Sequence, residues 1–221
     1  IRTGGVILRL FTGKRHGLFY FAPFLLIGGF YFVTQLFPLT YHIVHLPVDD
    51  AIPFVPAFVV PYLIWYLYVP LPLVYMFFTD QDLLRRQALA LFPGMAASLL
   101  FFLLYPTRID FRPAAQGAGV FRALCRLIYR FDRPVNVLPS LHCYEALSVH
   151  LSTFRSRSGR KHPALRAASA VLVLLICLST VFIKQHSVVD LAAGCALAIA
   201  SYALMKIIEK RREPHAAGQT V

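Results

Sequence analysis

Residues 165–208 read LRAASAVLVLLICLSTVFIKQHSVVDLAAGCALAIASYALMKII, two apolar runs separated by the short polar motif HSVVD. A hydrocarbon core about 30 Å thick needs roughly 20 helical residues at about 1.5 Å rise per residue. Each run meets that length, and its apolar residues are continuous rather than alternating. The stretch therefore predicts two membrane-spanning helices, at 165–184 and 187–208, that meet at a polar turn.

The whole chain has the same character, since 58% of its 221 residues are hydrophobic and its mean hydropathy is +0.63. Such a composition is too apolar for an ordinary soluble domain. Four further apolar segments read as spans, at 17–38, 56–78, 88–105 and 141–155. We therefore predict an all-α integral membrane protein with six transmembrane helices.

Basic residues predict the orientation of these spans. With six spans both termini lie on one face, and the 22 basic residues divide 15 to 7 in favour of that face. The positive-inside rule then makes both termini cytoplasmic. The net charge of +12 is explained in this way and calls for no nucleic-acid partner. The outer loop 106–140 is the exception, because six arginines lie where the rule disfavours them, which suggests a phosphate-bearing substrate: Arg108, Arg112, Arg122, Arg126, Arg130 and Arg133.

Composition divides the chain into three segments. Residues 1–16 mix basic and apolar side chains, which suits either an anionic membrane surface or a flank that only sets topology. Residues 17–210 are expected to form a single six-helix membrane domain, with an active-site core at about 85–208. Residues 211–221 read as a polar C-terminal tail.

Two histidine motifs lie where apolar segments meet polar loops, PSLH at 139–142 and HSVVD at 186–190. In the six-helix topology both motifs reach the outer face. The arginine-rich loop before PSLH, with Arg112 and Arg133, reaches the same face. Each motif alone is short enough to occur by chance. Their convergence at one depth is the stronger signal, and it favours phosphoryl transfer.

The residue types suit that chemistry. Asp190 follows His186 by four residues, so on a helix the carboxylate can orient the imidazole as a nucleophile. The alternative is a buried His–Asp pair that only ties two helices together. Ser140 suits a helix N-cap and places His142 in the first turn, where it can act as a general acid. Here the alternative is an ordinary capped helix start.

PSLH followed by STVFIKQHSVVD resembles the second and third signatures, PSGH and SRxxxxxHxxxD, of the type 2 phosphatidic acid phosphatase superfamily. The resemblance covers roughly residues 85–208. It implies a membrane phosphatase that hydrolyses a lipid phosphate monoester or pyrophosphate through a phosphohistidine on His186. It also implies orientation by Asp190, His142 as the acid, and no metal or other cofactor. We expect a multi-pass protein of a bacterial cytoplasmic membrane, with its active site facing outward.

This chain departs from the family pattern at three places. Leu141 replaces the usual glycine, as in the branch that resembles inositol phosphorylceramide synthases. Thr180 stands in place of an arginine, for which Lys184 is the substitute, unless Lys184 is an interfacial anchor. The first signature, KxxxxxxRP, is matched by Arg112-Pro113, which we prefer, or by Arg133-Pro134, and either arginine could instead bind lipid headgroups. The expected phosphate-binding residues are therefore Arg112, Lys184, Ser140 and Arg133.

Other functions remain open at this stage. A phospho-headgroup could be transferred to a second lipid alcohol instead of water, which Leu141 favours. A protein of another class, a non-catalytic lipid-phosphate binding protein or a transporter, would use the same residues for binding only. We expect no metal site, although one metal-like cluster occurs in the first outer loop, formed by His42, His45, Asp49 and Asp50.

Overall fold

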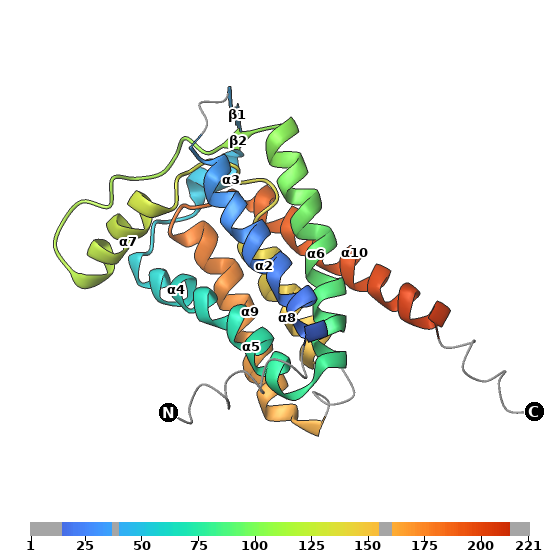
Figure 1. Cartoon of the computed structure of the whole chain (residues 1–221). Helices are drawn as coiled ribbons and strands as arrows, with labels where there is room; N and C mark the ends of the chain where they lie inside the picture. Colours follow the sequence, from blue (N-terminus) through green and yellow to red (C-terminus); the bar gives the residue numbers. More distant parts are fainter. Residues whose placement is uncertain (1–14, 37–39, 155–160, 213–221) are drawn as a thin grey trace, which may run out of the picture.

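The computed structural model describes residues 15–36, 40–154 and 161–212 (Figure 1). Residues 1–14 and 213–221, which hold most of the predicted N-terminal segment and tail, lie outside the described residues. The elements in chain order are α2 (Arg15–Thr34), β1 (His42–Ile43), α3 (Pro47–Ala51), the 3-10 helix η1 (Pro56–Phe58), α4 (Val59–Tyr68), α5 (Pro70–Thr79), α6 (Gln81–Leu104), β2 (Thr107–Arg108), α7 (Val120–Phe131), α8 (Leu141–Val149), the π-helix η2 (His150–Phe154), α9 (Pro163–Phe182) and α10 (Val188–Arg212).

Four helices are long and apolar enough to cross a membrane: Pro56–Thr79, Gln81–Leu104, Pro163–Phe182 and Val188–Arg211. They coincide with four of the six predicted spans, so the chain is an all-α protein with several membrane-spanning helices. The other two predicted spans correspond to α2, which contains the shorter apolar helix Ala22–Tyr31, and to α8 with η2.

Two helix ends differ from the predicted spans for local reasons. Asp80 caps α6, since its carboxylate accepts a hydrogen bond from the Leu83 N–H at 2.9 Å. The helix therefore begins at Gln81, ahead of the predicted residue 88. The predicted span 56–78 is divided into α4 and α5 at Pro70, which lacks an N–H and occupies the first position of α5.

The core lies where α5, α6, α8 and α10 meet. Tyr144 of α8 packs beside Gly94, and its hydroxyl lies 2.7 Å from the Ala90 carbonyl and 2.6 Å from the Leu91 carbonyl. Pro93 interrupts the hydrogen bonding of α6 at this point. The tyrosine hydroxyl therefore joins α8 to the backbone of α6 just before Pro93. The buried apolar cluster around it comprises Val69, Leu73, Met76, Phe77, Leu84, Leu91, Met95, Val149 and Ala198.

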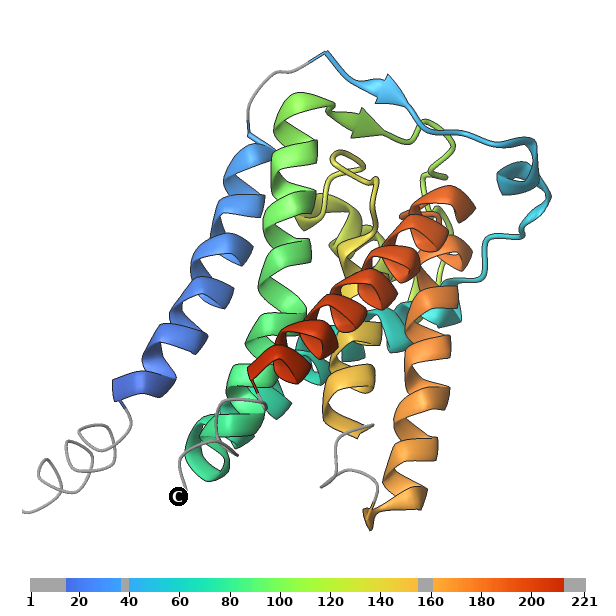
Figure 2. The same cartoon turned by 90° about the vertical axis from the view of Figure 1, so that its right-hand side faces the viewer.

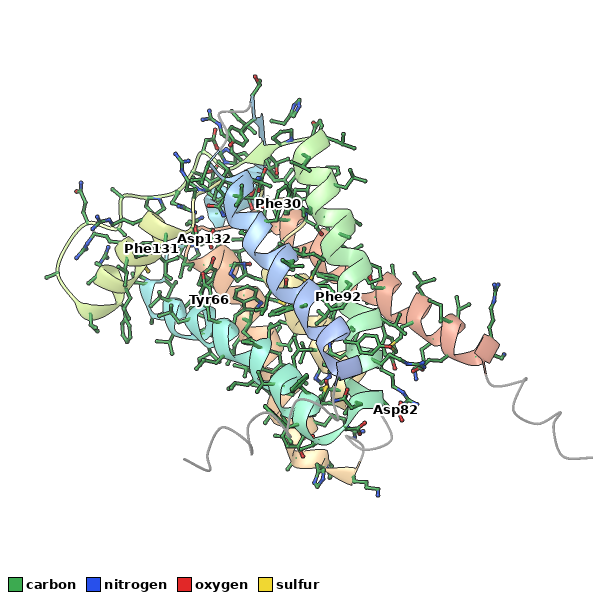
Figure 3. The ribbon with its side chains drawn as sticks, in the orientation of Figure 1. Phe30, Tyr66, Asp82, Phe92, Phe131 and Asp132 are labelled. Atoms are coloured by element: carbon green, nitrogen blue, oxygen red, sulfur yellow. The ribbon has the colours of Figure 1, made fainter. Side chains whose placement is uncertain are left out.

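Helix α7 corrects the prediction of a continuous loop over residues 106–140. It lies beside the bundle rather than within it (Figure 1). Cys125 and Ile128 face the protein, whereas Val120 is 65% exposed and Phe131 is 71% exposed. Figure 3 shows Phe131 and Asp132 at the end of α7 that lies next to the bundle. The polar face of α7 carries Arg122, Arg126 and Arg130.

The loops at one end of the bundle are joined to each other. Strands β1 and β2 pair in parallel, with His42 opposite Thr107, and Arg108 bridges to Val135. Figure 2 shows these strands at the end of the molecule where α9 turns into α10. The start of α2 and the end of α10 lie toward the opposite end. The three loops that contain β1, β2 and Val135 therefore lie, together with the α9–α10 turn, in one layer at this end of the helices.

Candidate active site

Ser140 caps α8 and so fixes the position of His142. The Ser140 side chain is buried, and its Oγ accepts from the Cys143 N–H at 3.5 Å. The predicted N-cap is confirmed, and His142 lies in the first helical turn. Its buried ring lies against two aromatic rings of α4, with centroid distances of 4.4 Å to Tyr62 and 4.1 Å to Trp65. These rings restrict the orientation of the imidazole.

The turn between α9 and α10 carries His186. The Lys184 N–H donates to the Val181 carbonyl at 3.1 Å, and the Gln185 N–H donates to the Thr180 carbonyl at 2.8 Å. This pattern is a Schellman motif, whose left-handed position usually holds glycine. Lys184 takes that position with φ +55°, at a cost of about 1 kcal/mol. The close turn buries His186 at the end of the bundle.

His186 lies two residues before α10, and Asp190 lies in the first turn of that helix. The His186 Nδ1 and the Asp190 Oδ2 are 3.4 Å apart, which is longer than an ordinary hydrogen bond. The two side chains face each other as predicted, but not from one helix face, because α10 begins only at Val188. The Asp190 Oδ2 instead accepts from the Ser187 N–H at 2.9 Å, over the start of the helix. The carboxylate nevertheless faces Nδ1, which leaves Nε2 as the ring nitrogen away from it.

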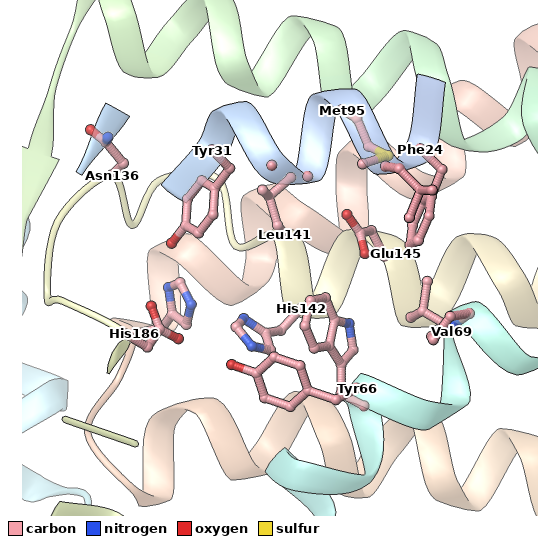
Figure 4. A pocket seen from close by; sticks show the side chains of 16 residues that line it. Phe24, Tyr31, Tyr66, Val69, Met95, Asn136, Leu141, His142, Glu145 and His186 are labelled. Atoms are coloured by element: carbon pink, nitrogen blue, oxygen red, sulfur yellow. The ribbon is translucent and has the colours of Figure 1, made fainter. Parts of the chain in front are cut away.

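The two histidine motifs converge on one cavity. Their backbones are joined directly, because the Ser140 N–H donates to the Asp190 carbonyl at 3.0 Å. The ring centroids of His142 and His186 are 5.7 Å apart. Both rings line a cavity of about 330 Å³ (Figure 4). Its other walls are mainly apolar, and they include Phe24, Leu25, Gly28, Gly29, Trp65, Val69, Pro70, Met95 and Leu141.

A second, smaller cavity lies on another side of His186. Its volume of about 10 Å³ is close to that of a single water-sized sphere. It is lined by both arginines that match the first signature, Arg112 and Arg133, together with Gln185. Asp132 and His186 line both cavities, so the two cavities share a wall there. The His186 imidazole therefore lines the same small cavity as the two arginines.

Arg112 is the more firmly held of the two arginines. Its guanidinium donates to the Asp132 carbonyl at 3.1 Å and to the Gln185 Oε1, and it lies 4.5 Å from the centroid of the Tyr129 ring. Burial lowers the pKa of Arg112, but a guanidinium keeps its charge in proteins. Arg133 is exposed, and its Nη1 donates to the Gln35 carbonyl at 2.7 Å.

Lys184 lines neither of these cavities. Its ammonium group donates to the backbone carbonyl of Asp49 and lies 5.5 Å from the centroid of the Phe111 ring. The Asp49 carboxylate in turn accepts from the Ser187 hydroxyl at 2.6 Å and from the Val188 N–H at 2.9 Å. The loop that contains Asp49 thus holds the start of α10. A phosphate-binding role for Lys184 remains a prediction.

The metal-like cluster of the first outer loop is divided in the structure. The Asp49 carboxylate accepts a hydrogen bond from Ser187 at the start of α10. His45 instead contacts the carboxylates of Asp50 at 2.9 Å and Asp110 at 3.0 Å. Across residues 15–36, 40–154 and 161–212, no group of three His, Cys, Asp or Glu side chains is placed to hold a metal ion.

Sequence reasoning missed the residues that support Arg112. The Tyr62 hydroxyl donates to the Asp132 carboxylate at 2.5 Å, and the Gln185 amide donates to the Tyr62 hydroxyl at 3.3 Å. The only sequence feature that pointed to Gln185 was its position next to His186. Asp132 had a similar signal, its place just before Arg133-Pro134. Tyr62 had none, because it lies 70 residues from its partner.

Gly194 allows the two motif-bearing helices to approach each other. A Cβ atom at this position would lie 2.4 Å from the Ser140 carbonyl oxygen, so Gly194→Ala must move α10 away from α8. We expect this substitution to destabilise the protein by about 1–3 kcal/mol. Thermal unfolding in detergent measures the effect. Gly29→Ala is the matched control, because a Cβ there has no neighbour within 4 Å. Equal unfolding temperatures for the two variants would contradict the close contact between α8 and α10 at Gly194.

A family model described as the PAP2 superfamily matches residues 114–204. That range contains both histidine motifs and Arg133, and it begins just after Arg112. No curated protein and no solved structure matches the chain.

Proposed function

We propose, from the match of residues 114–204 to the PAP2 superfamily, that this chain is a membrane phosphatase acting on a lipid phosphate monoester or pyrophosphate. One observation carries the proposal: the two histidines face one cavity with their rings 5.7 Å apart, and the two arginines lie on the other side of His186. In this proposal His186 is the nucleophile, His142 is the acid, and Arg112 and Arg133 bind the phosphate. These residues come from four separate segments of the chain.

The first step transfers the phosphoryl group to His186. The Nε2 lone pair attacks the terminal phosphorus, a nitrogen–phosphorus bond forms, and the bond from that phosphorus to the departing oxygen breaks. His142, protonated at the start, gives its proton to the departing oxygen, so a monoester leaves as the lipid alcohol and a pyrophosphate leaves as the lipid monophosphate. Asp190 faces Nδ1 and stabilises the positive charge on the imidazole. Arg112 and Arg133 offset the negative charge on the phosphoryl oxygens.

The second step returns the enzyme to its starting state. Water attacks the phosphohistidine, His142 takes a proton from that water, and the nitrogen–phosphorus bond breaks to release inorganic phosphate. The first turn of α8, capped by Ser140, supplies free backbone N–H groups and the positive end of a helix dipole for the phosphate oxygens. In this scheme Lys184 holds the turn that carries His186, through its contact with Asp49.

We also propose the six-span topology for residues 17–210, with both termini cytoplasmic and the site facing outward from a bacterial membrane. The α-helical segments alternate in direction along the chain, and the site layer lies at the end opposite the start of α2 (Figure 2). Residues 85–208 form the active-site core of this unit. The apolar walls of the large cavity suit a lipid chain, which reaches the site sideways from the outer leaflet.

Transfer to a lipid alcohol is the second candidate. Leu141 lines the cavity beside His142, where the family pattern usually has glycine, and its side chain makes that wall more apolar. The phosphohistidine, or its phospho-headgroup equivalent, would then pass to the hydroxyl of a second lipid. The two candidates share the first step and differ only in the acceptor.

Phosphate release from a panel of lipid phosphates tests the proposal. Purified protein in detergent with a chelator is expected to release inorganic phosphate, because no step above uses a metal ion. Substrate labelled with ³²P should also label the protein during turnover. A phosphoramidate is stable to alkali and labile to acid, so the label should follow that pattern. Consumption of lipid phosphate without phosphate release would favour the second candidate. Binding without any consumption would identify a binding protein or transporter instead.

The arginine pair gives a graded prediction. Arg112→Lys is expected to lower kcat/KM by about 100-fold, because an ammonium cannot grip the phosphoryl group bidentately or keep the contacts to Gln185 and Asp132. Arg133→Lys is expected to cost about 10-fold or less, because Arg133 is exposed and less firmly held. Steady-state phosphate release measures both values. A larger loss for Arg133→Lys would transfer the main role to that arginine.

A further inference from the structure

Glu145 is a buried carboxylic side chain in the wall of the large cavity. It lies on α8 one turn after His142 and is 3% exposed. Figure 4 shows its carboxyl group in the apolar half of the cavity, near Phe24, Val69 and Met95, on the far side of His142 from His186. A polar group is therefore present where the rest of the wall is hydrocarbon.

The carboxyl group of Glu145 has no hydrogen-bond or ion-pair partner among the described residues. Each of the other buried carboxylates of the described residues accepts at least one hydrogen bond, although the Asp190 Oδ1 accepts none. Asp49 accepts from Ser187 and Val188, Asp132 accepts from Tyr62, and Asp190 accepts from Ser187. A buried carboxyl group without a partner is costly, and folding alone gives no reason for it. Its position on the cavity wall points to a partner that arrives with the ligand.

The position along α8 indicates which part of a ligand that partner is. Three residues at about 1.5 Å rise place Glu145 roughly 4.5 Å beyond His142 along the helix axis. With the phosphate at His186 and the ester oxygen at His142, the carbons next to that oxygen lie beside Glu145. The remaining chain continues along the apolar wall.

We propose that Glu145 pairs with a hydrogen-bond donor, a hydroxyl or an ammonium group, on the lipid carbons next to the phosphate ester. The site then selects lipid phosphates that carry such a donor over those with plain hydrocarbon at that place. A plain chain leaves the carboxyl group unpaired, and a site built to bond a hydroxyl rejects analogues that lack it. This selection rests on the proposed function for its placement of the phosphate.

Three synthetic lipids of equal length separate the possible donors: hexadecyl phosphate, 2-hydroxyhexadecyl phosphate and 2-aminohexadecyl phosphate. The wild-type protein is expected to favour one or both substituted lipids by at least about 10-fold in kcat/KM. A preference for the hydroxy lipid identifies a hydroxyl as the donor, and a preference for the amino lipid identifies an ammonium group. Glu145→Leu is expected to bring each ratio close to 1, chiefly by improving the use of hexadecyl phosphate.

Two further variants control the result. Glu145→Gln keeps a carbonyl acceptor without charge, so it should retain a preference for the hydroxy lipid and lose one for the amino lipid. Glu209→Gln is the matched control, because Glu209 lies near the C-terminal end of α10, where it pairs with Arg86. This substitution should leave all ratios unchanged. Equal ratios in wild type and Glu145→Leu would overturn the proposal, even with full phosphatase activity.

Binding keeps the test independent of turnover. Trp65 is the single tryptophan of the chain and lines the same cavity, so its fluorescence reports ligand binding. If none of the three lipids releases phosphate, the proposed function fails, and the ratio of dissociation constants from Trp65 fluorescence still tests Glu145. A ratio that is above about 10 in wild type and close to 1 in Glu145→Leu supports the donor pairing. The same ratio in both proteins refutes it.

Discussion

Replacing His186 by alanine is expected to lower phosphate release from lipid phosphates by about 10⁴-fold or more, because the variant has no atom to carry the phosphoryl group. The ³²P label on the protein should disappear with it. Binding of the lipid should survive, since Arg112, Arg133 and the apolar wall are unchanged. Phosphate release and Trp65 fluorescence, measured on the same preparation, separate these two effects.

His45→Ala is the matched control for His186→Ala. His45 lies in the same layer of loops, where it contacts Asp50 and Asp110, and it lines neither cavity next to His186. Its removal should leave kcat within a few-fold of wild type. Substantial phosphate release and protein labelling by His186→Ala would rule out His186 as the phosphoryl carrier.

Replacing His142 by alanine is expected to slow the cleavage of an alkyl phosphate by about 10²–10⁴-fold, because the departing alkoxide then leaves without a proton. The loss should depend on the leaving group. A p-nitrophenyl phosphate ester releases a phenolate that needs no proton, so its single-turnover rate of protein labelling should fall far less. The ratio of the two rates measures the acid role separately from any loss of structure.

His150→Ala removes a second imidazole from the same helical segment and serves as the control. The His150 Nδ1 lies 2.9 Å from the Ser169 hydroxyl, away from both cavities. Any loss in this variant should be equal for the two leaving groups. An equal loss for both leaving groups in His142→Ala would remove the general-acid assignment and leave His142 with a structural role.

The sequence predicted the parts of the fold that depend on local pattern. Continuous apolar runs predicted the membrane-spanning helices, and the Ser140 cap predicted the start of α8. Helix α7 was missed because its apolar residues alternate with arginines at helical spacing, so a search for apolar runs read the segment as a loop. Its face toward the protein, with Cys125 and Ile128, becomes evident only with the bundle beside it.

The structure brings the predicted residues His142, His186, Arg112 and Arg133 close together, whereas the predicted Lys184 lines neither cavity. The topology alone indicated that His142, His186 and the two arginines share one face. The contacts that fix them depend on the paths of loops, and no local pattern encodes those paths. Asp49 stabilises a turn 138 residues away, and Tyr62 meets Asp132 across 70 residues. The sequence suggested Asp49 as a possible metal ligand, whereas in the structure its carboxylate caps the start of α10.

The contact between Asp49 and the start of α10 joins two segments that the ribosome makes 138 residues apart. Synthesis proceeds from the N-terminus, so the Asp49 carboxylate has no contact with Ser187 and Val188 until those further residues have been made. The turn that carries His186 closes only when α10 is in place. A nascent chain that ends before α10 already holds His142 and both arginines, yet the turn that carries His186 has not closed. In the proposed mechanism such a chain has no ordered nucleophile, so it would be inert toward the lipids around it.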